Sequence, residues 1–156
     1  MGAYLTAESG GKEEVTMRSL YDVVDLVQIL DPIVAKADKT SAAVDTKNYD
    51  SVRLVVNLGA SGDTLSGSVY LELEVEESDD NSSWSDVADE HLSDYVNGTN
   101  DGTFALIDAA AEDEQLYDVE YRGYKRYIRV IVNLTGTHSS GIPVGAVALC
   151  GLKKVA

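Results

Sequence analysis

The sequence is poor in the residues that cross-link a chain or hold a metal ion. It contains a single cysteine, Cys150, which excludes an intrachain disulfide and a cysteine-based metal cage. Because Cys150 lies in the apolar run VGAVALCGL, we expect its thiol to be buried and structural. The two histidines, His91 and His138, stand in polar segments outside any metal or triad motif, so we expect both to be exposed and neither to be catalytic.

Long hydrophobic runs are also missing. No stretch of the 156 residues is apolar for long enough to cross a bilayer, and the opening segment, MGAYLTAESGGKEEV, has no apolar core of signal-peptide length. We therefore expect no membrane partner and synthesis in the cytoplasm. A chain of this length suits one domain with one core. Residues 1–18 are expected to form a flexible N-terminal arm, and residues 19–156 the folded domain.

Positive charge is absent from the middle of the chain. The formal net charge is -15, and between Leu54 and Tyr121 there are eighteen Asp and Glu residues but no Lys or Arg. Such a surface repels phosphate backbones, so we expect no nucleic-acid partner. A soluble partner or a cation is more compatible with it, and the acidity also serves solubility.

Alternation of apolar and acidic residues predicts a strand with two different faces in the segment 68–77. Successive side chains of a strand point to opposite sides of the sheet. We expect the apolar side to face the core and the acidic side to face water or a partner. The apolar set is Val69, Leu71, Leu73 and Val75, and the acidic set is Glu72, Glu74 and Glu76.

Further strand patterns recur along the chain, and clusters of Gly, Asn, Asp and Ser separate them. Strands are predicted at residues 51–58, 68–77, 103–107, 117–122, 125–134 and 143–152. Short strands divided by turn formers indicate an all-β fold, an antiparallel β-sandwich of jelly-roll-like type, rather than β-α-β units. The segments 86–92 and 108–114 are compatible with single helical turns.

Two segments are less regular. The run at 20–35 also fits a helical stripe, but its β-branched residues and Pro32 favour a strand that begins at about Leu26. Residues 122–125 predict a tight hairpin between two strands, with Gly123 supplying a positive φ.

An acidic run at 76–81 offers several oxygen ligands to a hard cation such as calcium. The EF-hand pattern is absent, because no glycine and no closing glutamate follow at the required places. We favour the simpler interpretation that Asp79, Asp80 and Asn81 form a turn whose short side chains cap their own backbone. Trp84, which closes this segment, is expected to be a core aromatic.

A basic, tyrosine-rich cluster is the strongest candidate for a contact surface. In the strand 125–134, residues Ile128, Val130 and Val132 define the inward face, so Arg129 and Tyr127 point outward, and Tyr121 is also expected outside. Ion pairs with the acidic strand would neutralise this charge if the two strands are neighbours. Alternatively, the cluster docks on an acidic or sugar-bearing partner surface. The candidate contact residues are Arg122, Tyr124, Lys125, Arg126 and Arg129.

Three segments occur in the order NYDSVRLVVNLG, ESDDNSSWSDVAD and YRGYKRYIRV. With their surroundings, about residues 22–152, they resemble a family of small structural proteins of tailed phages, prophages and gene-transfer-agent-like particles. The resemblance implies a non-enzymatic virion protein that decorates or cements the outside of a capsid, with the major capsid protein and further copies of itself as partners. A tail or adaptor position in the virion is the alternative it leaves open. The acidic composition favours the outer surface, since packed DNA would repel it.

A looser likeness concerns the segments SDDNSSWSDV and KRYIRVIV, which are similar to strands of discoidin-type and related carbohydrate-binding jelly rolls. It implies an attachment module that binds sugars or lipids through loops, although no loop set matches residue by residue. The sequence assigns no catalytic, metal-binding or cofactor-binding residue, and we expect no cofactor.

Overall fold

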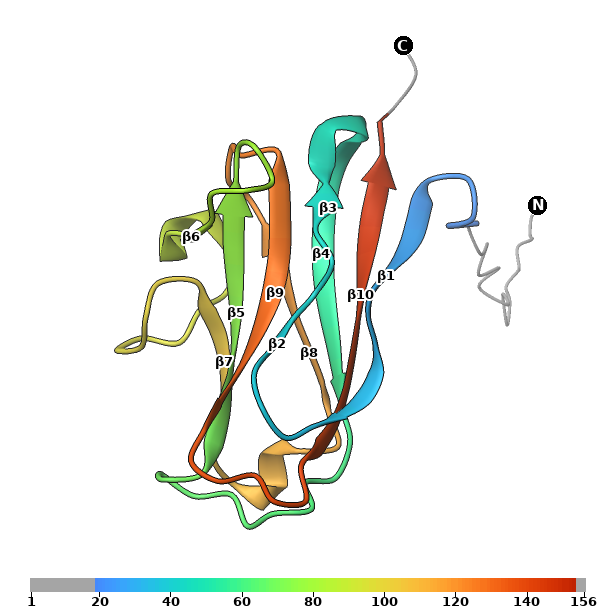
Figure 1. Cartoon of the computed structure of the whole chain (residues 1–156). Helices are drawn as coiled ribbons and strands as arrows, with labels where there is room; N and C mark the ends of the chain where they lie inside the picture. Colours follow the sequence, from blue (N-terminus) through green and yellow to red (C-terminus); the bar gives the residue numbers. More distant parts are fainter. Residues whose placement is uncertain (1–18, 154–156) are drawn as a thin grey trace, which may run out of the picture.

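Ten strands and three single turns of 3₁₀ helix make up the described part of the chain, residues 19–153 of the computed structural model (Figure 1). The strands are β1 (Val24–Ala35), β2 (Lys39–Thr40), β3 (Val44–Asp45), β4 (Tyr49–Leu58), β5 (Tyr70–Ser78), β6 (Ser85–Asp86), β7 (Thr103–Ile107), β8 (Leu116–Tyr121), β9 (Tyr127–Thr135) and β10 (Ile142–Leu152). The 3₁₀ turns are η2 (Thr46–Asn48), η3 (Asp89–His91) and η4 (Ala110–Glu112). The N-terminal arm predicted at residues 1–18 lies outside the described residues.

The strands form two antiparallel sheets. Sheet one has the order β1-β10-β4-β8. Sheet two has β9 and β5 at its centre, with β2 and β3 paired to the free side of β9 and β6 and β7 paired to the free side of β5. The predicted all-β sandwich is confirmed.

Strand pairing follows a nested pattern. The first strand pairs with the last (β1 with β10), then β2 and β3 with β9, β4 with β8, and β5 with β6 and β7. These pairs belong in turn to sheet one, sheet two, sheet one and sheet two. A long hairpin wound in this way across two sheets is a jelly roll, which agrees with the predicted type.

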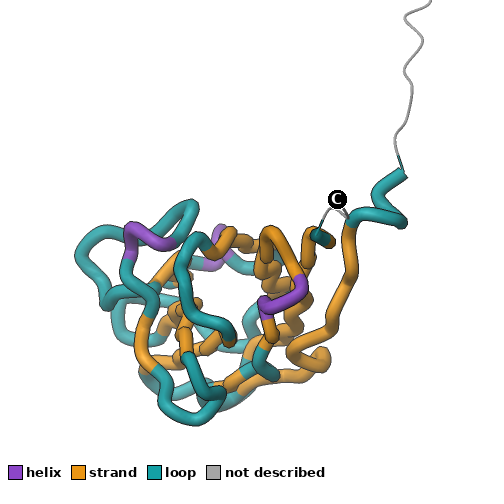
Figure 2. The backbone as a smooth tube through the Cα atoms, turned by 90° about the horizontal axis from the view of Figure 1, so that it is seen from above, coloured by secondary structure: helices purple, strands orange, loops and turns teal. Residues whose placement is uncertain are grey.

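The core lies between the sheets and is built from the inward side of every long strand. Figure 2, which looks along the strands, shows the two sheets surrounding this interior. Fully buried side chains come from both sheets, among them Leu54, Leu71, Leu73, Val119 and Ile128. Each such side chain contributes about 1.5–3 kcal/mol by leaving water. The inward sides predicted for the strands at 68–77 and 125–134 are confirmed within β5 and β9, whereas Val69 precedes β5 and is half-buried.

Cys150 is also in the core, as the sequence predicts, with its side chain fully buried on β10. Burial raises the pKa of its thiol to about 11. The thiol is therefore protonated at neutral pH and behaves as a small apolar group.

β1 is a strand, as predicted, but it runs through Pro32 to Ala35. Its pairing with β10 shifts between Leu30 and Ile33, so Pro32 lies in an irregular stretch of the ladder. β1 is also an edge strand of sheet one. Proline is tolerated at such a place because its missing N–H is not needed by a second neighbour. The helical turns predicted at 86–92 and 108–114 correspond to η3 and η4.

The hairpin predicted at residues 122–125 is wrong. β8 pairs with β4 in sheet one and β9 pairs with β5 in sheet two, so this segment carries the chain from one sheet to the other. Gly123 is not in the left-handed region. It is needed for another reason, because a Cβ atom there would collide with the phenol ring of Tyr121. Local turn composition identifies a change of direction but not the sheet that the next strand joins.

Candidate functional site

The connection from β8 to β9, residues 122–126, is called the corner here. Four of the predicted contact residues lie in the corner, and the fifth, Arg129, lies on β9. Arg126 donates two hydrogen bonds to Asp45 on β3, at 2.9 Å from Nε and 2.7 Å from Nη2. These bonds hold the pKa of the Asp45 carboxyl well below its usual range, at about 2. β3 pairs with the start of β9, which places Asp45 opposite Tyr127 and beside Arg126. The charge of Arg126 is thus already neutralised within the protein.

Arg129 is outward on β9, as predicted, directly opposite Glu76 on β5. Its Nε and Nη2 lie 2.7 and 2.6 Å from Glu76 Oε2, and the guanidinium lies 4.0 Å from the centre of the Trp84 ring. The cross-strand ion pair considered for the two strands is therefore present. Trp84 is half-buried on the outer face of sheet two, so its prediction as a core aromatic is wrong. A planar guanidinium can stack on an indole while its edge binds a carboxylate.

Lys125 approaches a carboxylate at the end of the core. Its Nζ lies 3.8 Å from Glu77 Oε1 and donates to Ser85 Oγ at 3.2 Å. Tyr121, expected outside, is buried instead and donates its hydroxyl to Glu77 Oε2 at 2.6 Å, while accepting from the Lys125 backbone N–H at 2.9 Å. Burial, with the bond to Glu77, raises the pKa of Tyr121 well above its usual value. The strand alternation of β8 places Tyr121 on the inward side with Val119.

Arg122 and Tyr124 are the two candidate residues that stay open to a partner. Arg122 lies 4.0 Å from Glu120, with 58% of its side chain exposed. Tyr124 is 89% exposed, and its ring meets His91 edge to face at 5.2 Å between ring centres. The structure therefore brings all of the predicted residues to one end of the sandwich, with four basic side chains next to acids and Tyr124 projecting.

The acidic turn after β5 caps itself. Asp80 accepts hydrogen bonds from the backbone N–H groups of Ser82 and Ser83 and from the hydroxyl of Ser78. These donors lower the pKa of Asp80 to about 2. Asn81 adopts a left-handed conformation, with φ of 59°. The geometry agrees with the turn interpretation favoured from the sequence.

Glu74 departs from the prediction that the acids of β5 face water. It is 5% exposed, accepts from Thr103 Oγ1 at 3.3 Å and from Asn133 Nδ2 at 2.6 Å, and its pKa is raised by burial. Its neighbours on β7 and β9 supply those donors, and alternation within β5 alone does not reveal them. Glu72 and Glu76 are half-buried on the same face.

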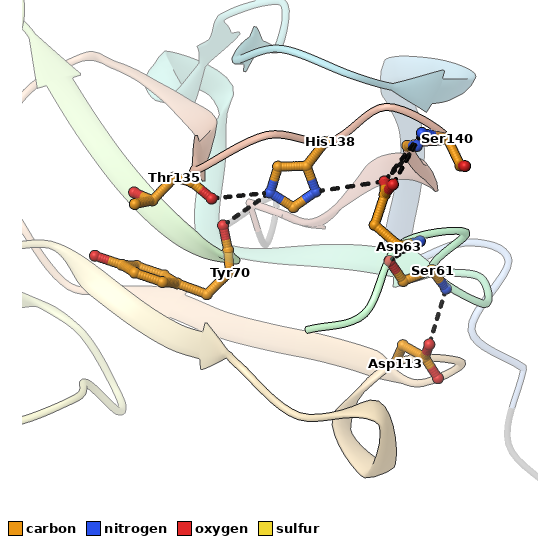
Figure 3. Close-up of polar contacts among 8 residues, drawn as sticks. Ser61, Asp63, Tyr70, Asp113, Thr135, His138 and Ser140 are labelled. Atoms are coloured by element: carbon orange, nitrogen blue, oxygen red, sulfur yellow. Dashed lines mark hydrogen bonds and ion pairs between the residues drawn. The ribbon is translucent and has the colours of Figure 1, made fainter. Parts of the chain in front are cut away.

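His138 is buried, so the prediction that it is exposed is wrong. Figure 3 shows its ring with one nitrogen toward Thr135 and Tyr70 and the other toward Asp63. Nε2 lies 3.2 Å from the Tyr70 carbonyl oxygen and 3.1 Å from that of Thr135. Because carbonyl oxygens only accept, Nε2 carries the hydrogen and donates to both. Nδ1 lies 4.0 Å from Asp63 Oδ2. His138 therefore joins two strand ends, a structural role.

Asp63 ties the same end of the sandwich together. Its carboxylate accepts from the backbone N–H of Ser140 at 3.0 Å and from that of Gly141 at 2.7 Å (Figure 3). These bonds, with a contribution from His138, lower the pKa of Asp63. In the same way, Asp113 accepts from the Ser61 N–H at 2.8 Å. Two carboxylates thus hold three connecting loops.

The outer face of sheet one carries a feature that strand alternation did not predict. Its outward residues on β10 are Pro143, Gly145, Val147, Leu149 and Gly151, none of them charged. Neighbouring strands add exposed apolar side chains, with Leu26 on β1 at 74% exposure and Leu116 on β8 at 65%. We call Leu26, Val34, Leu116, Val147 and Leu149 the apolar face. The apolar run at 143–152 could have indicated this face in the sequence. A strand that is apolar on both sides is typical of a strand that is covered on both sides.

The apolar face contains a groove of about 240 Å³ in the middle of the sheet. Gly145 at its floor has no side chain, and the irregular stretch of β1 around Leu30 and Pro32 forms one wall. Leu116 and Val147 line it as well. Such a hollow in an exposed apolar surface is typical of a site that receives an apolar side chain from a partner.

Among residues 19–153 there is no group of three or more His, Cys, Asp or Glu side chains placed to hold a metal ion. Searching the same part of the chain finds no helix of the length and hydropathy that a membrane crossing requires. In comparisons with known proteins, no family model and no curated protein matches this chain.

Proposed function

We propose that this protein is a structural component of a tailed-phage or prophage virion, a decoration or cement protein that binds the outside of the capsid and stabilises the shell. The observation that carries the proposal is the apolar face of sheet one. An exposed sheet surface with apolar side chains and a groove is a feature of proteins that bind other proteins. The charges of Arg53 and Asp118 on the same outer face are paired with each other. The jelly roll and the sequence resemblance to virion proteins support it, since viral structural proteins use this fold widely.

The mechanism follows from the surface chemistry. Burying the apolar face against the major capsid protein supplies the attraction, and an anchor in the groove beside Gly145 fixes the position. Tyr124 and Arg122 at the corner are exposed and add polar contacts to a neighbouring subunit or to another copy of the chain. Contacts of modest strength, repeated by the symmetry of the shell, bridge adjacent capsid subunits and stabilise it.

Co-sedimentation tests the proposal. The purified chain is mixed with particles of the encoding phage that lack it, and binding is followed by sedimentation and by electron microscopy with labelled protein. We expect binding to heads, and at least a tenfold loss with Leu26→Asp or Val147→Asp, because each places an unpaired charge in the contact. Tyr95→Asp is the matched control, as it adds the same charge at an exposed aromatic outside the apolar face.

Three outcomes contradict the proposal. They are absence of the protein from purified virions that contain all other head proteins, label confined to the tail, and unchanged sedimentation of both apolar-face variants. If Arg122→Ala or Tyr124→Ala weakens binding to particles, and the apolar-face variants weaken it as well, the corner is a second contact. If the corner variants bind particles as the parent protein does, the apolar face alone is the contact.

A further inference from the structure

The outer face of sheet two carries a second depression, away from the corner and the apolar face. It measures about 500 Å³ and is lined by residues of β5, of the end of β7, and of the loop between β6 and β7. Ligand sites commonly fall in this range of volume. The side chains that carry its chemistry are Tyr70, Glu72, Asn100, Leu106 and Asp108.

Strand pairing explains why these residues meet. Tyr70 and Glu72 are two positions apart on β5, so they point to the same side of the sheet. Glu72 lies opposite Leu106 on β7, and Asp108 follows Leu106 at the next outward position. The four therefore form a two-by-two arrangement on β5 and on β7 with the residue that follows it, and the loop residue Asn100 lines the same depression.

The wall formed by the loop is ordered by its own hydrogen bonds. The N–H of Val96 donates to the Thr103 carbonyl at 2.9 Å, and the Thr99 hydroxyl donates to the Val96 carbonyl at 2.6 Å. The Thr103 N–H donates in turn to the Asn100 carbonyl at 3.2 Å. The backbone at Asn100 is thus held in place before any ligand arrives, which lowers the entropy that the loop loses on binding.

The polar side chains here differ from their neighbours on the same face. Glu74 and Glu76, further along β5, accept hydrogen bonds from Asn133 and Arg129. Within residues 19–153, the side chains of Tyr70, Glu72 and Asp108 form no hydrogen bond or ion pair, and Tyr70 and Asp108 contribute only backbone groups. The depression is therefore lined by a tyrosine, two carboxylates and an amide whose hydrogen-bonding capacity is available.

We propose that this depression is a saccharide-binding site, specific for sugars without acidic groups. Tyr70 packs on the apolar C–H face of a pyranose ring, and the carboxylates of Glu72 and Asp108 accept hydrogen bonds from its hydroxyl groups. Asn100 both donates and accepts, which matches the dual character of a sugar hydroxyl. Two carboxylates on a protein of net charge -15 repel sialic and uronic acids and favour neutral or amino sugars.

A virion protein with such a site has a second role besides stabilising the shell, because it also attaches the particle to a glycan surface. The site and the apolar face lie on opposite outer faces of the sandwich, so one can bind a sugar while the other binds the capsid. The saccharide site does not depend on the proposed capsid role and is tested without particles.

Saturation-transfer NMR and isothermal calorimetry on the full chain test the site. The probes are the trisaccharides of glucose (β-1,4 and α-1,4), glucosamine and N-acetylglucosamine, with sialyllactose as the acidic probe. We expect at least one neutral or amino trisaccharide to bind at millimolar concentration and sialyllactose not to bind. Tyr70→Ala and Glu72→Gln should each weaken the binding about tenfold, the loss expected for one removed stacking contact or charged hydrogen bond.

Two further variants separate a loss of sugar binding from a loss of folding. Asn100→Ala changes an exposed loop side chain and should weaken binding severalfold, whereas Tyr124→Ala, the same kind of truncation at the corner, should leave it unchanged. The proposal is overturned if none of the trisaccharides binds, if sialyllactose binds best, or if Tyr124→Ala removes binding while Tyr70→Ala and Asn100→Ala do not. Binding that requires added calcium would also overturn it in favour of a cation site.

Discussion

The two outer faces of the sandwich use their side chains in different ways. On sheet two, near the corner, Arg129, Glu76 and Trp84 form one stack, and the buried Glu74 has donors on both sides. On sheet one, the outward positions of β10 are uncharged, and apolar side chains such as Leu26 stay exposed. Near the corner, the charges of the first face are paired within the molecule. The second gains by contact with another surface, and this comparison makes it the better candidate for docking than the basic cluster that stands out in the sequence.

The largest effect should come from breaking the stack on sheet two. Arg129→Ala leaves the carboxylate of Glu76 without its partner and uncovers the Trp84 ring, so the free energy of unfolding should fall by about 2 kcal/mol. Urea denaturation of the variant and the parent protein measures this difference in the free energy of unfolding. Arg129→Lys keeps the charge but not the planar fork and should recover only part of the loss. A change under about 0.5 kcal/mol would show that sheet two is no better satisfied than sheet one.

Asn133→Ala should have the next largest effect, with a pH dependence. The burial that raises the pKa of Glu74 makes the folded state bind its proton more tightly, so stability from this group is present at low pH and is lost as pH rises through the folded pKa. Removing the Asn133 donor raises that pKa further. The variant should lose about 1 kcal/mol at pH 7 and progressively less below pH 4.5, where Glu74 is protonated in both proteins. An equal loss at pH 7 and pH 4 would contradict this assignment.

Asp80→Ala should have a smaller effect with the opposite pH dependence. The pKa of Asp80 is lowered to about 2, so its stabilisation is present above the usual value of 3.8 and disappears as pH falls toward 2. Urea midpoints of the variant and the parent protein should therefore differ at pH 7 and converge near pH 2. Asp79→Ala, an exposed neighbour in the same turn, serves as the control. A difference that persists at pH 2 would mean that the turn depends on packing rather than on the carboxylate.

The smallest effect on stability belongs to the apolar face. Leu26→Ser should change the free energy of unfolding by less than about 0.5 kcal/mol, because the side chain is already in water in the isolated protein. The same substitution should weaken binding to particles, which separates folding from docking. A loss of stability like that of Arg129→Ala would indicate instead that the face supports the fold.

Much of the fold could be predicted from local pattern. The alternation in β5 and β9 identified their inward residues, and turn formers placed most strand boundaries within a few residues of their positions. Three of the predictions that failed share one cause. Trp84, Glu74 and His138 have environments set by residues 29 to 68 positions away, such as Arg129, Thr103 and Tyr70. No local pattern encodes such contacts.

The candidate sites show the same division. The sequence singled out the basic cluster because its charges are close along the chain, but the acidic partners of Lys125, Arg126 and Arg129 come from β3 and β5. The apolar face and the saccharide depression combine residues from separate strands. In the depression, Tyr70 with Glu72 and Leu106 with Asp108 are each two positions apart in the sequence. These pairs, and the apolar run of β10 in the face, were the neighbours that a sequence pattern could reveal.

By itself, the sequence determined that the protein is all-β, which side of β5 and β9 carries the buried apolar residues and where the chain turns, because the period of two in a strand is a local property of the backbone. The tertiary structure alone decided which strands are neighbours. Pairing β1 with β10 brings together residues at opposite ends of the described chain, and the corner passes between sheets instead of forming a hairpin. Those pairings depend on how two sheets fill one core, so they also decided which charges are neutralised and which surfaces stay open to a partner.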